Sequence, residues 1–457
     1  MHRRTTLPST ALHQSNPCFH SLARALSLGS LLLMFVAWSP QHVHALPPVF
    51  TGSEQSFYQL PAGTPSDEPG TVVRWQRYTP SAGLTLNSDG VIAYRMLYVS
   101  TGALGQRTLV SGSVLVPVRV YAPARPILGF GTGTQGMADS CAASHGIQAS
   151  TNYDIVYMRQ TLDLGWTVAV SDYQGQGTKT DQNLGGRADE HTYVVGTVLG
   201  KNVLDSVRAA RQFNNQFNTD RQREYPIKFA ISGNMSLSSK VVLWGYSEGG
   251  NSATWAAELQ PTYAAELKLV ALAAGGIPAD IAAVGTAINN RSSLQNVAFG
   301  VLIAAGIGYK AAYPELVLES RLTPAGLTLL DSVKSQCLID ILLHNFGGHI
   351  IQDYTTGGFN MLQDGAWLAR FEQNKLGAQP PKVPVFLYHA AQDEGVEYNQ
   401  GRQLARTYCA KGVRVNWNPY VGEHATGFVQ GMSAAIDFLN NRLNGVPTNA
   451  IVCSAIY

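Results

Sequence analysis

The pentapeptide Gly245-Tyr246-Ser247-Glu248-Gly249 holds a serine between two glycines. A serine hydroxyl is a poor nucleophile until a base takes its proton and a fixed geometry aims it. The Gly-x-Ser-x-Gly pattern places the serine on a sharp strand-to-helix turn that orients its hydroxyl. Larger residues in place of either glycine would clash there. The apolar run 241–244 precedes the pentapeptide and a helix-forming stretch, 250–258, follows it. The sequence therefore predicts Ser247 as a catalytic nucleophile.

A base and an orienting acid are expected later in the chain, in the order serine, acid, histidine that accompanies this turn. His424 follows the strand-like run 413–417, in a loop that can return to Ser247. Asp393 follows the strand-like run 383–388. We predict His424 as the general base and Asp393 as the acid that orients its ring.

Other residues compete for these roles. Asp280 follows the strand-like run 267–272, a second position at which the acid can occur. His389 lies at a strand end and is interpreted as a structural hydrogen-bonding residue. His344 and His349 fall in a helical insertion, where either could face solvent or substrate.

Acyl transfer also requires hydrogen-bond donors for the developing oxyanion. One predicted donor is the backbone N–H of Glu248, directly after the nucleophile. The second is expected in the glycine-rich turn Gly131-Thr132-Gly133-Thr134-Gln135-Gly136, with Thr134 favoured. The alternatives, an ordinary turn or a phosphate-binding loop, are disfavoured because no Gly-Lys-Ser/Thr follows.

Short apolar runs alternate with helical stretches and must position these residues. The runs 91–99 and 108–116 predict an antiparallel hairpin at a sheet edge, preceded by an extended arm from 46 to about 90. Further strands are expected at 126–131, 166–171, 240–244, 267–272, 383–388 and 413–417, with a helix at 200–213. This alternation predicts an α/β fold whose central sheet is mostly parallel, with helices on both faces.

Four segments are expected along the chain. Residues 1–45 form a signal peptide, 46–279 the first part of the catalytic core, 280–381 an inserted helical cap, and 382–457 the second part of the core. The insertion is too long for an ordinary loop in a compact domain and contains Ala/Gly/Ile-rich helical stretches.

The N-terminus has the pattern of an export signal. Arg3, Arg4 and Arg24 precede the apolar run 25–38, and Val43-His44-Ala45 resembles a cleavage site. Cleavage is predicted after Ala45, giving a secreted or periplasmic protein with no integral membrane segment. The alternative is an uncleaved anchor, although the run is shorter than the ~20 residues that usually span a bilayer.

Composition narrows the class of substrate. The 457 residues are 45% hydrophobic and 14% charged, with a formal net charge of +2. Such a balance argues against disorder and against a nucleic-acid partner, since no strong positive field is available. A neutral substrate is favoured over a polyanion.

Removal of the signal leaves four cysteines, Cys141, Cys337, Cys409 and Cys453. An even number in an exported chain favours two disulfides over free thiols, and no spacing typical of a zinc site occurs. Three pairings are open; nearness in sequence favours Cys409 with Cys453, which leaves Cys141 with Cys337.

Several motifs together resemble the secretory lipase family, which contains the fungal lipase A type enzymes and bacterial exported relatives. They are the segments 133–144, 172–177 and 245–250 and the loops of Asp393 and His424. The resemblance implies an α/β-hydrolase fold with an inserted helical cap. It also implies hydrolysis of neutral carboxylic esters, including acylglycerols, without a metal or organic cofactor, and it supports the two cysteine pairs.

The chain departs from the family pattern at two points. Alanine stands at position 143, where the family often has proline, and the long C-terminal flap of some fungal members is missing. The missing flap leaves acyl-chain specificity open.

Two other classes of function remain as alternatives. The same triad serves a secreted serine peptidase or an acyltransferase, because one fold hosts many reactions. A non-enzymatic binding protein on this fold would typically have lost the serine or the histidine, and both are present here.

Overall fold

The computed structural model describes most of the chain after the predicted signal peptide. The described residues are 44–63, 65–84, 90–119, 121, 124–178, 190–225, 239–291, 296, 298–344, 349–448 and 456. The basic and apolar parts of the predicted signal lie outside them. Residues 43–457 form one compact unit.

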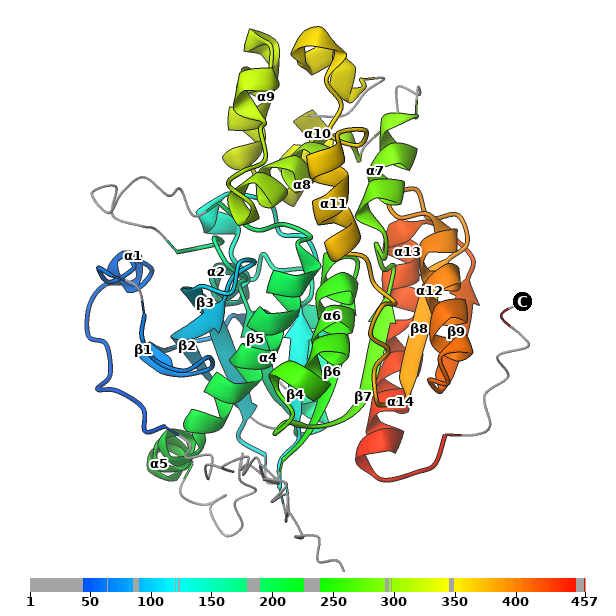
Figure 1. Ribbon diagram of the computed structural model, residues 1–457. Helices are drawn as coiled ribbons and strands as arrows, with labels where there is room; N and C mark the ends of the chain where they lie inside the picture. Colours follow the sequence, from blue (N-terminus) through cyan, green and yellow to red (C-terminus); the bar gives the residue numbers. More distant parts are fainter. Residues whose placement is uncertain are drawn as a thin grey trace, which may run out of the picture. The chain divides into compact units, whose positions relative to one another are not determined.

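A nine-stranded sheet organises this unit, in the order β1-β2-β3-β5-β4-β6-β7-β8-β9 (Figure 1). The strands β1, β2, β3 and β5 are joined by antiparallel pairs, and the strands from β5 through β4 to β9 pair in parallel. The bounds are Val72–Tyr78 (β1), Val91–Thr101 (β2), Arg107–Pro117 (β3), Ile127–Gly131 (β4), Thr167–Ser171 (β5), Lys240–Tyr246 (β6), Lys268–Gly275 (β7), Val385–Ala390 (β8) and Val415–Tyr420 (β9). The sheet confirms the predicted α/β-hydrolase class.

The edge strand β1 was not expected from the sequence. The predicted hairpin of β2 and β3 therefore lies one strand inside the sheet edge, and the arm from 46 to about 90 is partly a strand. The sequence pattern does not predict this strand, because Arg74 places a charge in it. In the structure the Arg74 guanidinium donates to the carbonyl oxygens of Phe57 (2.6 Å) and Gln59 (2.7 Å). The segment before β1 therefore supplies hydrogen-bond partners for Arg74, a residue that the sequence pattern alone assigns to a loop.

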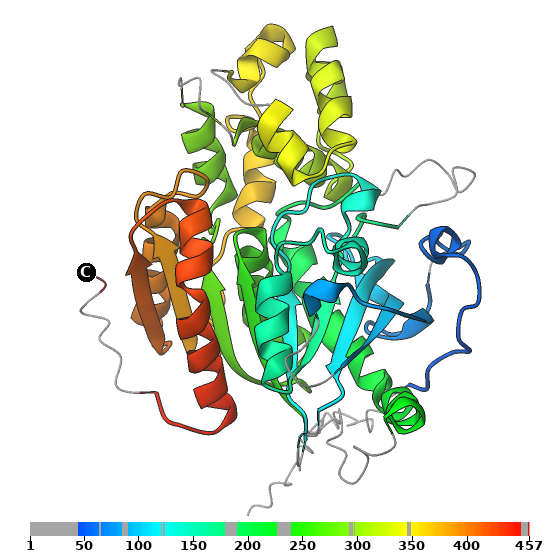
Figure 2. The ribbon, with the colours of Figure 1, turned by 180° about the vertical axis from the view of Figure 1, so that it is seen from behind.

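Helices cover both faces of the sheet (Figures 1 and 2). One apolar core contains side chains of α4, α6 and α12, and the other contains side chains of α2, α3 and α14. The bounds are Glu54–Phe57 (α1), Ala143–Ala149 (α2), Ile155–Asp163 (α3), Gly196–Gln212 (α4), Asn214–Glu224 (α5), Glu248–Tyr263 (α6), Tyr398–Ala410 (α12), His424–Gln430 (α13) and Met432–Leu443 (α14). Burial of both faces explains why the parallel strands are apolar almost throughout.

The regular elements described between β7 and β8 are helical. Their main members are α7 (Ile281–Asn289), α8 (Phe299–Ala312), α9 (Pro324–Lys334), α10 (Leu338–His344) and α11 (Gly365–Gln373). The side chains of Asp280, Thr323 and Asp364 cap α7, α9 and α11 by accepting backbone N–H bonds. The inserted helices form a third apolar cluster together with residues from outside the insertion, among them Tyr193 and Val198. At its base the N–H of Leu376 donates to the carbonyl of Ala279 over 2.9 Å.

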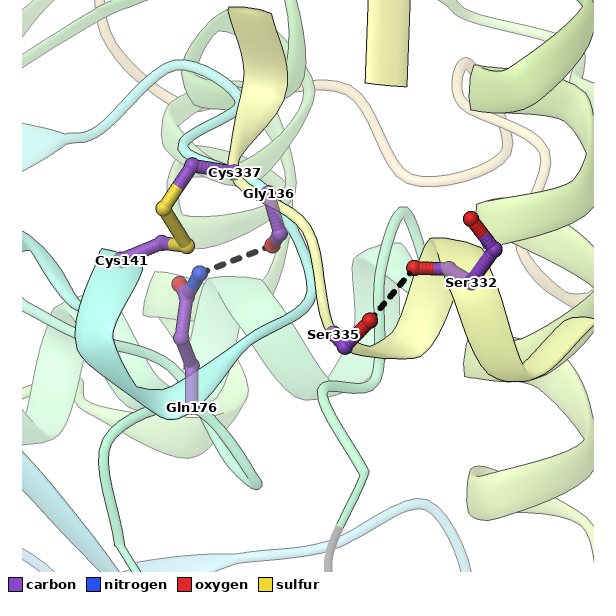
Figure 3. The surroundings of a disulfide bond; sticks show 6 residues. All are labelled: Gly136, Cys141, Gln176, Ser332, Ser335 and Cys337. Atoms are coloured by element: carbon purple, nitrogen blue, oxygen red, sulfur yellow. Dashed lines mark hydrogen bonds between the residues drawn. A yellow bond between two sulfur atoms is a disulfide. The ribbon is translucent and has the colours of Figure 1, made fainter. Parts of the chain in front are cut away.

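A disulfide joins Cys141 to Cys337, with Cα atoms 5.5 Å apart (Figure 3). The side-chain amide of Gln176 donates to the carbonyl of Gly136 beside it, over 2.8 Å. Cys409 is also in a disulfide, and the cysteine predicted as its partner, Cys453, lies outside the described residues. None of the helices within the described ranges is long and apolar enough to cross a membrane.

Candidate active site

Ser247 occupies the turn between β6 and α6. Its backbone has φ 58° and ψ −122°, a conformation that costs a non-glycine residue on the order of 1–3 kcal/mol. The neighbouring backbone maintains it: the N–H of Ser247 donates to the carbonyl of Gly275 over 2.9 Å, and its carbonyl accepts from Asn251 over 2.9 Å. The side chain is partly buried and lines a cavity.

The glycines around Ser247 are required by close backbone contacts. A Cβ on Gly245 would lie 2.1 Å from the carbonyl oxygen of Gly249, and one on Gly249 would lie 2.1 Å from that of Gly131. The strands β4 and β6 and the start of α6 therefore meet with no room for side chains. The strand–turn–helix context expected for a serine nucleophile is present.

Asp393 and His424 are in direct contact. Nδ1 of His424, the first residue of α13, lies 2.7 Å from Oδ2 of Asp393 in the loop after β8. A carboxylate only accepts, so Nδ1 carries the proton and Nε2 is left as the basic nitrogen. Burial alone would raise the pKa of Asp393, but hydrogen bonds from His389 and His424 more than offset it and hold that pKa well below its usual range.

His389, near the end of β8, contacts the same carboxylate oxygen. Its Nε2 lies 2.8 Å from the carbonyl oxygen of Val396 and 3.2 Å from Oδ2 of Asp393, and its side chain is fully buried. The interpretation of His389 as a structural residue agrees with this geometry. Its contact with Asp393 was not expected.

The other competitors lie away from the cavity that contains Ser247. Asp280 caps α7 by accepting from the N–H of Ala283 (3.1 Å) and pairs with Lys375 (2.8 Å). The side chains of His344 and His349 are 63% and 50% exposed, and neither lines that cavity.

The turn after β4 presents Thr134 to the cavity. The N–H of Gly133 is already engaged, since it donates to Oδ2 of Asp154 over 3.0 Å. Thr134 is thus the residue of this turn that lines the cavity. Glu248 begins α6, and the first N–H groups of a helix have no partner inside it.

A cavity of about 480 Å³ contains Ser247, His424, Thr134 and Glu248 on its wall. The remaining wall is mostly apolar, and the cap and α13 supply a large part of it. Its apolar members include Ile281, Val284, Ile288, Val301, Leu302, Leu338, Leu342, Phe428 and Val429. A few polar groups thus lie on the wall of a mostly apolar cavity, as expected for a small-molecule site. Within the described residues, no group of three or more His, Cys, Asp or Glu could hold a metal ion.

Comparison with known proteins identifies the family. The profile of the family described as secretory lipase matches residues 142–450. The chain belongs to the secretory lipase family. A secreted triacylglycerol lipase of Malassezia furfur is 27% identical over 436 residues, which are 91% of this chain and 80% of that protein. Lipase 10 of Candida albicans is 26% identical over 443 residues, 91% of this chain and 86% of the relative.

Solved structures share the fold. The closed state of Candida antarctica lipase A has a TM-score of 0.73 at 22% identity, over 87% of each chain. A rice cell wall degrading esterase from Xanthomonas oryzae has a TM-score of 0.63 at 21% identity, over 83% of this chain and all of that one. This lipase family hydrolase therefore has the α/β-hydrolase fold of both.

Three residues around the predicted oxyanion donors were missed. Burial raises the pKa of Asp154 to about 7, the bond from Gly133 opposes this rise, and the charge of Glu248 adds to it. His191 contacts the Glu248 side chain and Tyr193 contacts that of Thr134. No spacing rule links these residues to the nucleophile motif, because Asp154 directly precedes α3 and His191 and Tyr193 lie in the segment before α4.

Proposed function

We propose that this member of the secretory lipase family is a carboxylic ester hydrolase acting on acylglycerols and related neutral esters. The observation that carries the proposal is that Ser247 and His424 line one mostly apolar cavity, while Nδ1 of His424 bonds to Asp393. The apolar wall suits an acyl chain, and relatives of this chain are named as secreted triacylglycerol lipases.

In the proposed reaction, His424 Nε2 takes the proton as Ser247 Oγ bonds to the ester carbonyl carbon. The carbonyl oxygen becomes an oxyanion held by the N–H groups of Thr134 and Glu248. The alcohol leaves with the proton from His424, and an acyl-enzyme remains. Water then adds through the same base, and the acid is released as the Ser247 hydroxyl is restored. Asp393 fixes the ring and stabilises the imidazolium.

A fluorophosphonate probe tests the nucleophile. Wild-type protein is expected to hydrolyse acylglycerols and to carry the probe on Ser247, as located by peptide mass spectrometry. Ser247→Ala is expected to lose both the label and the turnover while keeping its melting temperature. Label on another residue, or an active Ser247→Ala variant, would contradict the proposal. Peptide and alcohol-acceptor substrates, assayed in parallel, separate a peptidase or an acyltransferase from an esterase.

We also infer that the protein is exported. The support is the basic and apolar N-terminal segment together with relatives that are named as secreted lipases. Mass spectrometry of protein recovered outside the cytoplasm is expected to find Leu46 as the first residue. A mature protein that retains residues 25–38 would instead support an uncleaved anchor.

A further inference from the structure

The short segment 191–193 contacts both predicted oxyanion donors through side chains. Nε2 of His191 lies 2.9 Å from Oε1 of Glu248, and both residues are only 1% exposed. The hydroxyl of Tyr193 lies 2.9 Å from Oγ1 of Thr134, and this pair is buried as well. Two donors that are far apart in sequence thus share one supporting segment.

The burial of the Glu248 side chain is unusual for its position. An acidic residue in the first turn of a helix interacts favourably with the helix dipole while remaining in water. Removing a carboxylate from water is costly unless it is hydrogen-bonded, and His191 supplies such a bond. Nδ1 of His191 has no hydrogen-bond partner among the described residues, which agrees with a ring that carries its proton on Nε2.

The segment is itself fixed on its sheet side. The N–H and the hydroxyl of Thr192 both donate to the carbonyl of Gln174, over 3.0 and 3.3 Å. The ring of His191 lies nearly parallel to that of Tyr173, with centroids 5.8 Å apart and planes 7° apart. The hydroxyl of Tyr173 donates to the carbonyl of Thr132, in the turn that contains Thr134, over 2.9 Å.

The segment is also in contact with the cap. Tyr193 belongs to the apolar cluster of the inserted helices. A Cβ on Gly308 of α8 would lie 2.4 Å from the backbone nitrogen of Tyr193, so the helix packs directly on this backbone. His191 and Tyr193 are therefore held between the sheet and the cap, which gives them the rigidity that a positioning role requires.

We propose that His191 and Tyr193 are positioning residues of the oxyanion hole: His191 holds Glu248 and Tyr193 holds Thr134, so that both backbone N–H groups meet the developing oxyanion. The proposal rests on the proposed ester hydrolysis at Ser247. Because the donors act on charge that develops only in the transition state, these side chains contribute to kcat and leave KM unchanged.

The variants His191→Leu and Tyr193→Phe test this role. Loss of one whole oxyanion donor lowers kcat about 10²- to 10³-fold, so we expect a misplaced donor to lower it about tenfold or more. KM is expected to change less than about twofold, since ground-state contacts are kept. His191→Gln retains an N–H near the position of Nε2 and is expected to recover most of the lost rate.

Each rate is expressed per active site, titrated with the fluorophosphonate probe, so that misfolded protein does not count. Affinity for a trifluoromethyl ketone, whose adduct with Ser247 carries an oxyanion, is expected to fall in parallel with kcat/KM. Tyr309→Phe is the matched control because it removes a buried cap hydroxyl that has no partner in the described part of the chain. It is expected to keep the wild-type kcat.

Unchanged kcat per titrated site in His191→Leu and Tyr193→Phe would overturn the positioning role. So would equal loss in His191→Leu and His191→Gln, or a loss confined to KM. An inactive or unlabelled wild-type protein would instead overturn the proposed function, so the two failures are distinguishable.

Discussion

Asp393 receives hydrogen bonds from two imidazole rings, of which only His424 faces the cavity. Its other oxygen, Oδ1, accepts from the backbone N–H groups of Gly395 (3.0 Å) and Val396 (2.7 Å). Four donors thus surround one buried carboxylate, and they keep its pKa well below the usual range despite burial. The four hydrogen bonds therefore favour the charged form of the acid that orients the His424 ring.

The comparison of Asp393→Asn with Asp280→Asn tests the assignment of the acid. We expect Asp393→Asn to lower kcat about 10⁴-fold, because an amide can hold His424 in the wrong tautomer. Asp280→Asn is the matched control, since asparagine caps helices as well as aspartate does. Its kcat is expected to stay within about twofold of wild type, because surface substitutions of this kind usually change free energies little. Turnover lost only in Asp280→Asn would show that the acid is misassigned.

Asp154 makes the stability of the fold depend on pH. Its pKa is raised to about 7 in the folded protein, above the value of about 4 for an unfolded chain. The folded state holds the proton more tightly, so its contribution to stability is present at pH 4 and is lost as the pH rises to 7. We expect the free energy of unfolding of Asp154→Asn to fall less steeply over this range, as measured by urea denaturation. If the free energies of unfolding of the wild type and of Asp154→Asn changed equally with pH, the prediction would be contradicted. Other buried carboxyls titrate alike in both proteins and so cancel in this comparison.

At the scale of elements, the turns around Ser247 and Asp393 follow from sequence because each lies directly after a parallel strand. The apolar runs of β4 to β9 are long enough to place every strand, although their exact ends shift by one to three residues in places. Such patterns do not predict β1, because it contains the charged Arg74, whose hydrogen-bond partners belong to the preceding segment. Sequence patterns also do not predict the contacts of His191 and Tyr193, because these contacts depend on how the loop packs and not on residue spacing.

At the scale of the whole molecule, the Cys141–Cys337 disulfide closes a long loop, with a sequence separation of 196 residues. Backbone bonds accompany it: the N–H of Met137 donates to Gln336 (2.9 Å) and that of Leu338 donates to Gln135 (2.8 Å). The insertion is thus tied to the turn after β4 and to the residues that follow it.

The double variant Cys141→Ala/Cys337→Ala measures what this bridge contributes. We expect the free energy of unfolding to fall by about 2–5 kcal/mol, because the unfolded chain regains the freedom of the long loop. Thermal unfolding without reductant checks this value. The backbone bonds between the turn and α10 remain in the variant, so kcat is expected to change less than stability does. An unchanged melting temperature would contradict the prediction.

The attachments of the inserted helices have a mechanical consequence. The insertion is held at its base by the Ala279–Leu376 bond and farther along by Cys337. Further contacts restrain it, since Asn374 accepts from Thr197 of α4 and Lys334 pairs with Glu190. Any displacement of α8 changes the contact of Gly308 with the Tyr193 backbone. Given the positioning role proposed above, a displacement of the cap therefore also displaces the segment that supports the predicted oxyanion donors.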